Sequence, residues 1–246
     1  MDVGNAVLLA AAGLGAGSVN AVAGGGSLIS FPALLAAGYP SITANVTNAI
    51  AVLPGYVGGS LAYRRELGGQ AARIRALALT SAAGAGAGAA LLLVSPASVF
   101  EAIVPWLILA ACGLLAVQPR IAAARRRREH APLALHATVF AATVYGGYFG
   151  AGLGIMLLAI LGLFIDDDLQ RLNALKGVLS LLVALVTAAG FAVFGPVAWD
   201  AAAIVGITCL AGGALGVGIA RRLSARVLRG AVIAYGVGVA IALLAG

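Results

Sequence analysis

Charged residues are scarce in this chain of 246 residues and make up only 9% of it, whereas hydrophobic residues make up 62%. A soluble domain is about half apolar and about a quarter charged. With a mean hydropathy of +1.08, the chain has too little polar sequence to cover a surface that faces water, which excludes a soluble domain. We therefore expect an all-α polytopic membrane protein whose main surface partner is the lipid bilayer.

The residue types that usually support catalysis and metal binding are also few. The chain has two cysteines, Cys112 and Cys209, both within apolar stretches, and two histidines. No spacing typical of a nucleotide site, a metal centre or a catalytic triad occurs. No Asp or Glu lies deep in an apolar segment, apart from Glu101 near the end of one, so a proton relay of carboxylates is not expected. These absences predict a protein that is not an enzyme and that has no cofactor or metal.

The formal net charge of +7 does not predict a nucleic-acid partner, because the basic residues are confined to short clusters between apolar segments. Lys and Arg concentrate in loops on the cytoplasmic side of membrane proteins, and we interpret all four clusters as lying on that side. The run Arg125–Arg128, in the expected cytoplasmic loop 120–131, is either a topology determinant or a contact for anionic lipid heads. The clusters are Arg64, Arg65, Arg73 and Arg75; Arg120 and Arg125–Arg128; Arg171 and Lys176; and Arg221, Arg222, Arg226 and Arg229.

Six apolar segments have about the 20 residues that are needed to cross a bilayer. Two further apolar regions, 5–37 and 132–165, are too long for one helix and are interrupted by glycines. All basic clusters fall on one side only if each of these regions enters the membrane and returns as a re-entrant hairpin. Each half then has one hairpin and three spans, so the second half is inverted relative to the first and both termini lie outside the cytoplasm. The expected first repeat covers 1–119, with spans 41–63, 76–94 and 99–119, and the second covers 132–246, with spans 169–193, 197–220 and 227–245.

Two glycine clusters, each followed by a pair of polar residues, recur at one offset along the chain. Subtracting 24 from 152, 26 from 154, 45 from 173 and 48 from 176 gives 128 each time. Apolar segments that are broken at equivalent positions of two repeats indicate the binding site of a secondary transporter. The first copy is Gly24-Gly25-Gly26-Ser27 with Asn45 and Asn48, and the second is Gly152-Leu153-Gly154 with Asn173 and Lys176.

The residue types at these positions favour an anion as the ligand. The N-terminus of a helix carries about half a positive charge, and glycine lets a ligand approach its N–H groups. Lys176 lies well inside its span, where a cation usually faces a cavity on a substrate path; its alternative is to reach back to the surface beside Asp166–Asp168. The glycines could instead serve only close helix packing, and the asparagines hydrogen bonds between helices. We expect substrate contacts from Asn20, Gly24, Gly25, Gly26, Ser27, Asn45, Asn48, Gly152, Gly154, Asn173 and Lys176.

Several short motifs, spread over nearly the whole chain, are similar to those of one known family. They are Gly17–Ser27, Ala44–Asn48, Leu53-Pro54-Gly55, Tyr63-Arg64-Arg65, Arg171–Lys176 and Phe194–Trp199. With these motifs the chain resembles the TauE/SafE family of sulfite exporters. The resemblance implies a carrier of sulfur-containing anions such as sulfite and sulfonates, or of related organic anions. Gly177 departs from the family pattern, in which Asn is frequent at this position, and this departure removes a donor from the implied site.

We therefore interpret the chain as a secondary transporter of the bacterial inner membrane that exports a small sulfur-containing anion by alternating access around the two hairpins. An inside-negative potential drives an anion outward by about 2.3 kcal/mol per charge per 100 mV. Two alternatives stay open, namely uptake of an organic anion coupled to protons or sodium, and a membrane scaffold or assembly subunit without transport activity. A homo-oligomer is compatible with the sequence.

Overall fold

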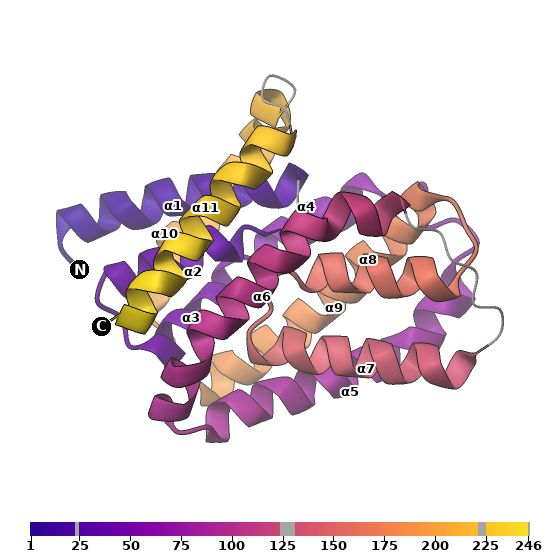
Figure 1. Cartoon of the computed structure of the whole chain (residues 1–246), viewed down its shortest axis with the longest axis horizontal. Coiled ribbons are helices and arrows are strands. Elements are labelled where there is room, and N and C mark those ends of the chain that lie inside the picture. Colours follow the sequence, from indigo (N-terminus) through magenta and orange to yellow (C-terminus); the bar gives the residue numbers. More distant parts are fainter. Residues whose placement is uncertain (23–24, 124–130, 221–224, 246) are drawn as a thin grey trace.

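The computed structural model describes residues 1–22, 25–123, 131–220 and 225–245, and all regular structure within these ranges is α-helical (Figure 1). The expected all-α fold is confirmed. The helices are α1 (Val3–Val22), α2 (Ser27–Ala36), α3 (Ser41–Ala51), α4 (Leu53–Ala62), α5 (Ala71–Val94), α6 (Ala97–Ala123), α7 (Pro132–Tyr148), α8 (Leu153–Phe164), α9 (Leu169–Phe194), α10 (Trp199–Ala220) and α11 (Ala225–Ala245).

Four helices in the described ranges are long and apolar enough to cross a membrane, namely α1, α5, α6 and α9. The expected spans 76–94, 99–119 and 169–193 overlap α5, α6 and α9. The last two expected spans, 197–220 and 227–245, overlap α10 and α11 almost completely. A chain with several such helices is a multi-pass membrane protein.

Each of the two glycine-broken regions forms a long helix followed by a short one. In region 5–37, α1 has 20 residues and α2 has 10; in region 132–165, α7 has 17 and α8 has 12. At 1.5 Å per residue α1 is about 30 Å long, which is enough to cross the hydrocarbon core, whereas α2 reaches about half that depth. The two arms of each region are therefore unequal, and the chain breaks where the sequence has its glycines.

The expected span 41–63 is two helices, α3 and α4, which are separated by Val52. Pro54, the second residue of α4, has no N–H to donate to the carbonyl of Ile50, and its ring crowds that carbonyl. The Gly55 N–H donates to Val52 O at 3.1 Å, in a tighter turn. The helix is therefore interrupted in the middle of a segment for which sequence reasoning predicted a continuous span.

Two helix pairs pack with their backbones in contact, α1 against α10 and α5 against α7. A Cβ on Gly17 of α1 would lie 2.0 Å from Cys209 O in α10, and a Cβ on Gly88 of α5 would lie 2.0 Å from Val144 O in α7. Glycine is therefore required at both positions for close packing. When the residue numbers are shifted by 128, the range of α1 nearly coincides with that of α7 and the range of α5 with that of α10. The two packed pairs therefore correspond to each other.

The middle of the bundle is the interface between α3–α4 and α9, which we call the seam. At one end of the seam, a Cβ on Gly177 of α9 would lie 3.8 Å from Ser60 Oγ in α4. At the other end, Ala198 N, just beyond α9, donates to Thr47 Oγ1 in α3 at 3.0 Å. The end of α4 thus lies beside the start of α9, and the two segments run antiparallel along the seam.

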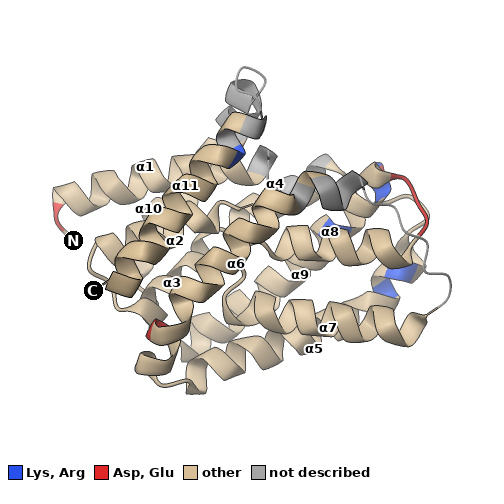
Figure 2. Ribbon diagram, in the orientation of Figure 1, with Lys and Arg blue, Asp and Glu red and all other residues tan. Residues whose placement is uncertain are grey.

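The largest group of Lys and Arg among the described residues lies at one end of the bundle, which we call the basic end (Figure 2). It contains the turn after α4, the start of α5 and the start of α9. The N-terminus and the last turn of α11 both lie at the opposite end (Figure 1). The expected basic loop 120–131 falls mostly outside the described residues, as do Arg221 and Arg222.

Ion pairs join the two halves of the chain at the basic end. Asp167, between α8 and α9, pairs with Arg73 of α5 and with Arg171 of α9. Partial burial acts to raise the pKa of Asp167, but hydrogen bonds from the two guanidinium groups outweigh burial and hold the pKa at about 2. Arg171 Nη1 also donates to Gly68 O at 3.1 Å, and Gln70 Nε2 donates to Arg171 O at 2.9 Å. The loop after α4 is thereby fixed to the start of α9.

Candidate functional site

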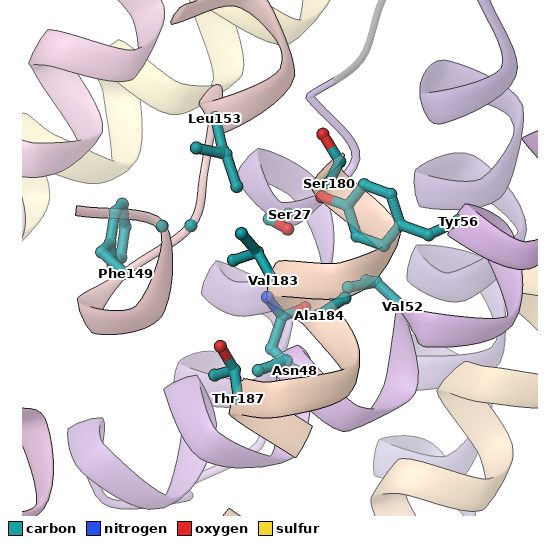
Figure 3. A pocket seen from close by; sticks show the side chains of 13 residues that line it. Ser27, Asn48, Val52, Tyr56, Phe149, Leu153, Ser180, Val183, Ala184 and Thr187 are labelled. Atoms are coloured by element: carbon teal, nitrogen blue, oxygen red, sulfur yellow. The ribbon is translucent and has the colours of Figure 1, made fainter. Parts of the chain in front are cut away.

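A small pocket lies within the seam, between the two glycine breaks (Figure 3). It has about 30 Å³ of room for the centres of water-sized molecules, and one water needs about 10–15 Å³, so about two waters fit. Both halves of the chain contribute to its wall, through α2, α3 and α4 and through α7, α8 and α9. The lining residues are Ser27, Asn48, Ala49, Val52, Tyr56, Gly146, Phe149, Gly150, Leu153, Ser180, Val183, Ala184 and Thr187.

Two buried hydroxyl groups in the pocket have no hydrogen-bond partner. Ser180 is 2% exposed and Thr187 is 3% exposed, and neither hydroxyl is bonded to another described residue. In Figure 3 the hydroxyls of Ser180 and Tyr56 lie at one end of the pocket and that of Thr187 at the other. Leaving a buried polar group without a partner costs about 1–3 kcal/mol, and a polar ligand or water in the pocket would remove this cost.

Asn48 supplies an amide to the same pocket. Its Oδ1 accepts a short hydrogen bond from Ser30 Oγ of α2, which orients the side chain. The amide nitrogen, Nδ2, is left as a donor at the pocket wall (Figure 3). Ser27, at the start of α2, adds a hydroxyl to this wall. Two of the expected site residues, Asn48 and Ser27, therefore lie together in the pocket.

At the first glycine break, the backbone N–H groups that precede α2 already have an acceptor within the protein. Asn20 Oδ1, near the end of α1, accepts from Gly25 N at 3.1 Å and from Gly26 N at 2.8 Å. A Cβ on Gly26 would lie 2.3 Å from Ala16 O, so this glycine serves the close packing of α2 against α1. In this structure Asn20 thus occupies the place that we expected for a substrate. Gly24 lies outside the described residues.

The second glycine break is built differently. Gly150 and Gly152 both have a φ of 80°, in the left-handed region that glycine adopts without strain, and they turn the chain from α7 into α8. Gly154 follows in the first turn of α8, and its N–H has no hydrogen-bond acceptor in the described part of the chain. A Cβ on Gly154 would lie 3.6 Å from Cδ and 3.8 Å from Nζ of Lys176. The lysine side chain therefore lies against the start of α8.

Lys176 is largely buried in the early part of α9. Within the described ranges its ammonium group has no ion-pair partner, since Asp167 pairs with Arg73 and Arg171 instead. A lone cation at such a position is costly, and residues of this kind usually mark a substrate path. Lys176 does not line the pocket, but it lies one helical turn before Ser180 and on the same face of α9.

The remaining expected donors take other positions along the seam. Asn45 is 2% exposed, and its Nδ2 donates to Tyr148 O at 2.9 Å. This bond joins α3 to the end of α7, as the alternative of a hydrogen bond between helices predicted. Asn173 lies in the first turns of α9, toward the basic end, and Gly152 is the residue that precedes α8. Neither lines the pocket.

Sequence reasoning did not select Tyr56, Ser180 or Thr187 as site residues, although all three line the pocket. The spacing held a signal for two of them. Ser180 and Thr187 lie four and eleven positions after Lys176, so one face of α9 carries all three. Hydroxyls are common in membrane helices for packing alone, and spacing does not tell which of them lack a partner.

Comparison with known proteins places the chain within one family. The family described as sulfite exporter TauE/SafE matches residues 9–243. The chain belongs to the TauE/SafE family. The resemblance that the sequence motifs indicated is therefore confirmed, and as a TauE/SafE member this multi-pass protein is a membrane transporter by family rather than an enzyme.

Two known proteins are similar to the chain over most of its length. One is "Probable membrane transporter protein ORF9" of a Sinorhizobium species, which is 28% identical over 231 residues that cover 94% of this chain and 88% of the relative. The other is "Probable membrane transporter protein" of Haemophilus influenzae, which is 30% identical over 230 residues that cover 91% of this chain and 87% of the relative. No solved structure matches the chain.

Proposed function

We propose that this TauE/SafE protein is a secondary carrier of a small sulfur-containing oxyanion, such as sulfite or a sulfonate, and that it works by alternating access. One observation carries the proposal: both halves of the chain meet around a pocket in which the hydroxyls of Ser180 and Thr187 have no partner among the described residues. A substrate that is held between two halves is exposed to either side of the membrane when the halves rock about it.

The polar groups of the seam suit an anion. The pocket presents hydroxyls and an amide, and no carboxylate is among its lining residues. Lys176 and the N–H of Gly154 add a positive charge and a helix N-terminus one turn of α9 away. Uptake coupled to protons would need a carboxylic acid in the pocket, and none is among the lining residues. These groups therefore favour anion transport without coupling to protons.

The arrangement of the helices supports two inverted repeats, each made of a re-entrant hairpin and three spans. Moved by 128 positions, α1 and α2 fall on α7 and α8, α3–α4 fall on α9, and α5 and α6 fall on α10 and α11. The contacts between helices follow the same exchange. The packed pair α1 and α10 corresponds to the packed pair α7 and α5, and α6 packs against its own counterpart, α11. Such an exchange is what an approximate two-fold axis between the two halves produces. Because α3–α4 and α9 are antiparallel along the seam, this axis lies in the membrane plane if these helices cross the membrane.

We further propose that the protein lies in the bacterial inner membrane with its basic end in the cytoplasm and both termini outside. The separation of the basic end from both termini supports this orientation (Figure 2), because basic loops prefer the cytoplasm. The membrane potential then favours export of an anion. Fusions to Gly246 of one reporter that is active only in the periplasm and one that is active only in the cytoplasm test the orientation. Activity of the cytoplasmic reporter alone would contradict it.

The pocket has to widen for such a substrate to bind. It has room for about two waters, and a sulfite ion, with one sulfur and three oxygens, needs more space. We propose that α9 moves relative to α3–α4 along the seam, and that the interruption at Val52 lets α3 and α4 tilt separately. The same movement opens the pocket to one side of the membrane at a time.

Counterflow in proteoliposomes tests the transport function with four anions: sulfite, thiosulfate, sulfoacetate and chloride. We expect at least one labelled sulfur anion to accumulate transiently in vesicles that are loaded with the same unlabelled anion, and we expect chloride not to exchange. Absence of counterflow with all of these anions would overturn the proposal. Exchange of chloride alone would show that the substrate is not a sulfur-containing anion.

A matched set of variants tests the pocket. Ser180→Ala combined with Thr187→Val should slow counterflow about tenfold or more, since each lost hydrogen bond to substrate is worth about 1 kcal/mol. Ser81 is the control, because its buried Oγ also lacks a partner among the described residues but lies on α5, outside the pocket. Ser81→Ala should leave counterflow unchanged. An equal effect of both changes would exclude the pocket as the substrate site.

A further inference from the structure

The polar groups of the seam do not end with the pocket, and they continue toward the basic end. On α9 the pocket lining begins at Ser180. One turn earlier, Lys176 lies on the same face of the helix, largely buried and without an ion-pair partner in the described ranges. A cation inside a membrane bundle needs an anion or a watery cavity beside it, and the pocket does not extend to this residue.

A second polar group faces the same turn of α9 from the opposite side of the seam. Ser60 Oγ of α4 is buried and has no hydrogen-bond partner among the described residues. A Cβ on Gly177 would lie 3.8 Å from this oxygen, so Ser60 and the turn that contains Lys176 are neighbours. Ser60 also lies one turn after Tyr56, a pocket residue, and on the same face of α4. Unpartnered hydroxyls therefore continue from the pocket toward the basic end.

The third group is the start of α8. The N–H of Gly154 has no acceptor within the described residues, and the side chain of Lys176 lies against this glycine. An ammonium group and a helix N-terminus are both positive and repel each other unless an anion lies close to both. Gly154 of α8 and Ser60 of α4 thus flank one turn of α9, and both present donors.

The repeat gives this region a counterpart inside the pocket. Under the offset of 128 residues, Asn48 corresponds to Lys176. Thr187 corresponds to Gly59, the neighbour of Ser60. Asn48 and Thr187 both line the pocket. The corner of the pocket that holds these two residues is therefore equivalent, under the exchange of repeats, to the region around Lys176 and Ser60.

We propose that the seam holds the anion at two successive sites, the pocket and a second site formed by Lys176, Ser60 and the N–H of Gly154. We call the second one the Lys176 site. This inference rests on the proposed transport function and adds a binding site to it. A sulfite or sulfonate group has three oxygens, and the Lys176 site offers an ammonium, a hydroxyl and an N–H group as separate donors to them.

The two sites differ in charge, and this difference gives the path a direction of loading. An anion that arrives from the basic end binds first at the Lys176 site, where a full positive charge holds it. It then moves along α9 by about one turn, roughly 6 Å, to Ser180. The pocket has only neutral donors, so it holds the anion less tightly and releases it more readily to the opposite side.

Equilibrium binding, measured beside counterflow, separates the two sites. The full chain is purified in mild detergent and titrated with radiolabelled sulfite, thiosulfate or sulfoacetate, whichever of these exchanges in counterflow. We expect Lys176→Met to weaken binding about tenfold or more and Ser60→Ala to weaken it about threefold. Ser180→Ala with Thr187→Val should weaken the pocket and slow counterflow, while the tighter binding at the Lys176 site changes less than twofold. Ser81→Ala should change neither quantity.

Thermal stability, measured on the same samples, distinguishes binding from folding. Because the hydroxyl of Ser60 has no partner in the described part of the chain, Ser60→Ala should keep or raise the unfolding temperature while binding falls. Lys176→Gln replaces Lys176→Met if the latter does not fold. Unchanged binding in the Lys176 and Ser60 variants would overturn the second site. If Ser180→Ala with Thr187→Val weakened binding as much as Lys176→Met does, the anion would have a single site instead of two. Absence of counterflow in the unchanged protein would instead mark failure of the transport function itself.

Discussion

The two glycine breaks occupy equivalent positions in the two halves of the chain, yet their glycines serve different purposes. At the first break, Asn20 accepts from the N–H groups of Gly25 and Gly26, and Gly26 packs against α1. At the second break, left-handed glycines turn the chain, and the N–H of Gly154 has no acceptor in the described part of the chain. Lys176 lies beside it. The N–H groups of Gly25 and Gly26 at the first break are thus bonded within the protein, whereas the N–H of Gly154 at the second break is an unused donor within the described ranges.

This difference shows that the two glycine-broken regions are more alike in the path of their backbone than in their chemistry. The position equivalent to Asn20 is Tyr148, whose side chain has no amide oxygen to cap the start of α8. Its carbonyl accepts instead from Asn45. The counterpart of Lys176 is the neutral Asn48. Positive charge and free N–H groups therefore meet only at the second break, and we assign the stronger anion binding to that half.

The largest expected effect comes from adding one methyl group at each break. In Gly26→Ala the new Cβ would lie 2.3 Å from Ala16 O and 2.9 Å from Asn20 Cγ, so α2 cannot keep its place and we expect loss of folded protein. In Gly154→Ala the nearest atom, Cδ of Lys176, is at an ordinary contact distance of 3.6 Å, and we expect normal folding. The measurement is the yield of monodisperse protein in mild detergent.

The second part of this test concerns binding. The methyl group of Gly154→Ala stands between the helix N-terminus and Lys176, so binding of the anion should weaken about tenfold in a folded protein. A folded Gly26→Ala variant with normal stability would refute the packing role of the first break. Normal anion binding by Gly154→Ala would remove the second break from the site.

Removal of the charge that distinguishes the two halves should have the next largest effect. A hydrogen bond to a charged group contributes about 1.5–3 kcal/mol, so Lys176→Met should weaken binding about ten- to a hundredfold. Asn48→Ala, at the equivalent position, should cost at most about 0.5–1.5 kcal/mol, as expected for a neutral donor. Lys176→Arg should restore binding poorly, because a planar guanidinium group needs a different geometry from an ammonium group. Equal effects at both positions would show that the two halves contribute equally.

The sequence predicted the helices well where long apolar runs are continuous, as in α5 and α9, because only helices of that length satisfy their backbone inside a bilayer. It failed at Val52, where Pro54 interrupts a run that is apolar throughout. The candidate site was harder to predict, because identical spacing can hide different roles. Asn45 and Asn48 share one helix face, but Asn45 bonds to a carbonyl and Asn48 lines the pocket.

Hydroxyl groups show the same limit of sequence reasoning. Thr143 Oγ1 donates to Val139 O, one turn back in its own helix, at 2.9 Å, whereas Thr187 Oγ1 has no partner among the described residues. Nothing in the two local sequences separates these cases, since both threonines lie in apolar helices. The partner of a hydroxyl depends on its side-chain rotamer and on neighbouring helices, which a single sequence does not give.

A smaller effect is expected from removing the internal acceptor of the first break. In Asn20→Ala the N–H groups of Gly25 and Gly26 lose their acceptor, which should lower the free energy of unfolding by about 1–3 kcal/mol. Anion binding should change less than twofold, because the proposed Lys176 site lies at the second break. Thermal unfolding and binding are measured on the same sample. An anion affinity that rises clearly in this variant would show that the first break is a latent anion site.

The same contrast extends to the connections that follow the two breaks. Tyr39, between α2 and α3, and Asp167, between α8 and α9, are 128 positions apart. Burial and the nearby carboxylate of Asp200 raise the pKa of Tyr39, so this connection holds a neutral phenol. Asp167 is ionised and pairs with Arg73 and Arg171. Of these two positions, only the one that follows the second break is held by ion pairs.

The smallest expected effect tests these ion pairs. Because the folded pKa of Asp167 lies at about 2, below its ordinary value of about 3.9, ionisation of this group stabilises the fold above about pH 4, and this contribution is lost as the pH falls toward 2. Arg73 and Arg171 have side chains that are 39% and 36% exposed, so solvent screens the pairs, and Asp167→Asn should cost only about 0.5–1 kcal/mol. Thermal unfolding of both proteins should differ by a constant amount between about pH 5 and pH 8, and the curves should converge below about pH 4. A difference that changes between pH 6 and pH 8 would assign the effect to another group, and a loss larger than that of Asn20→Ala would make this connection more important than the first break.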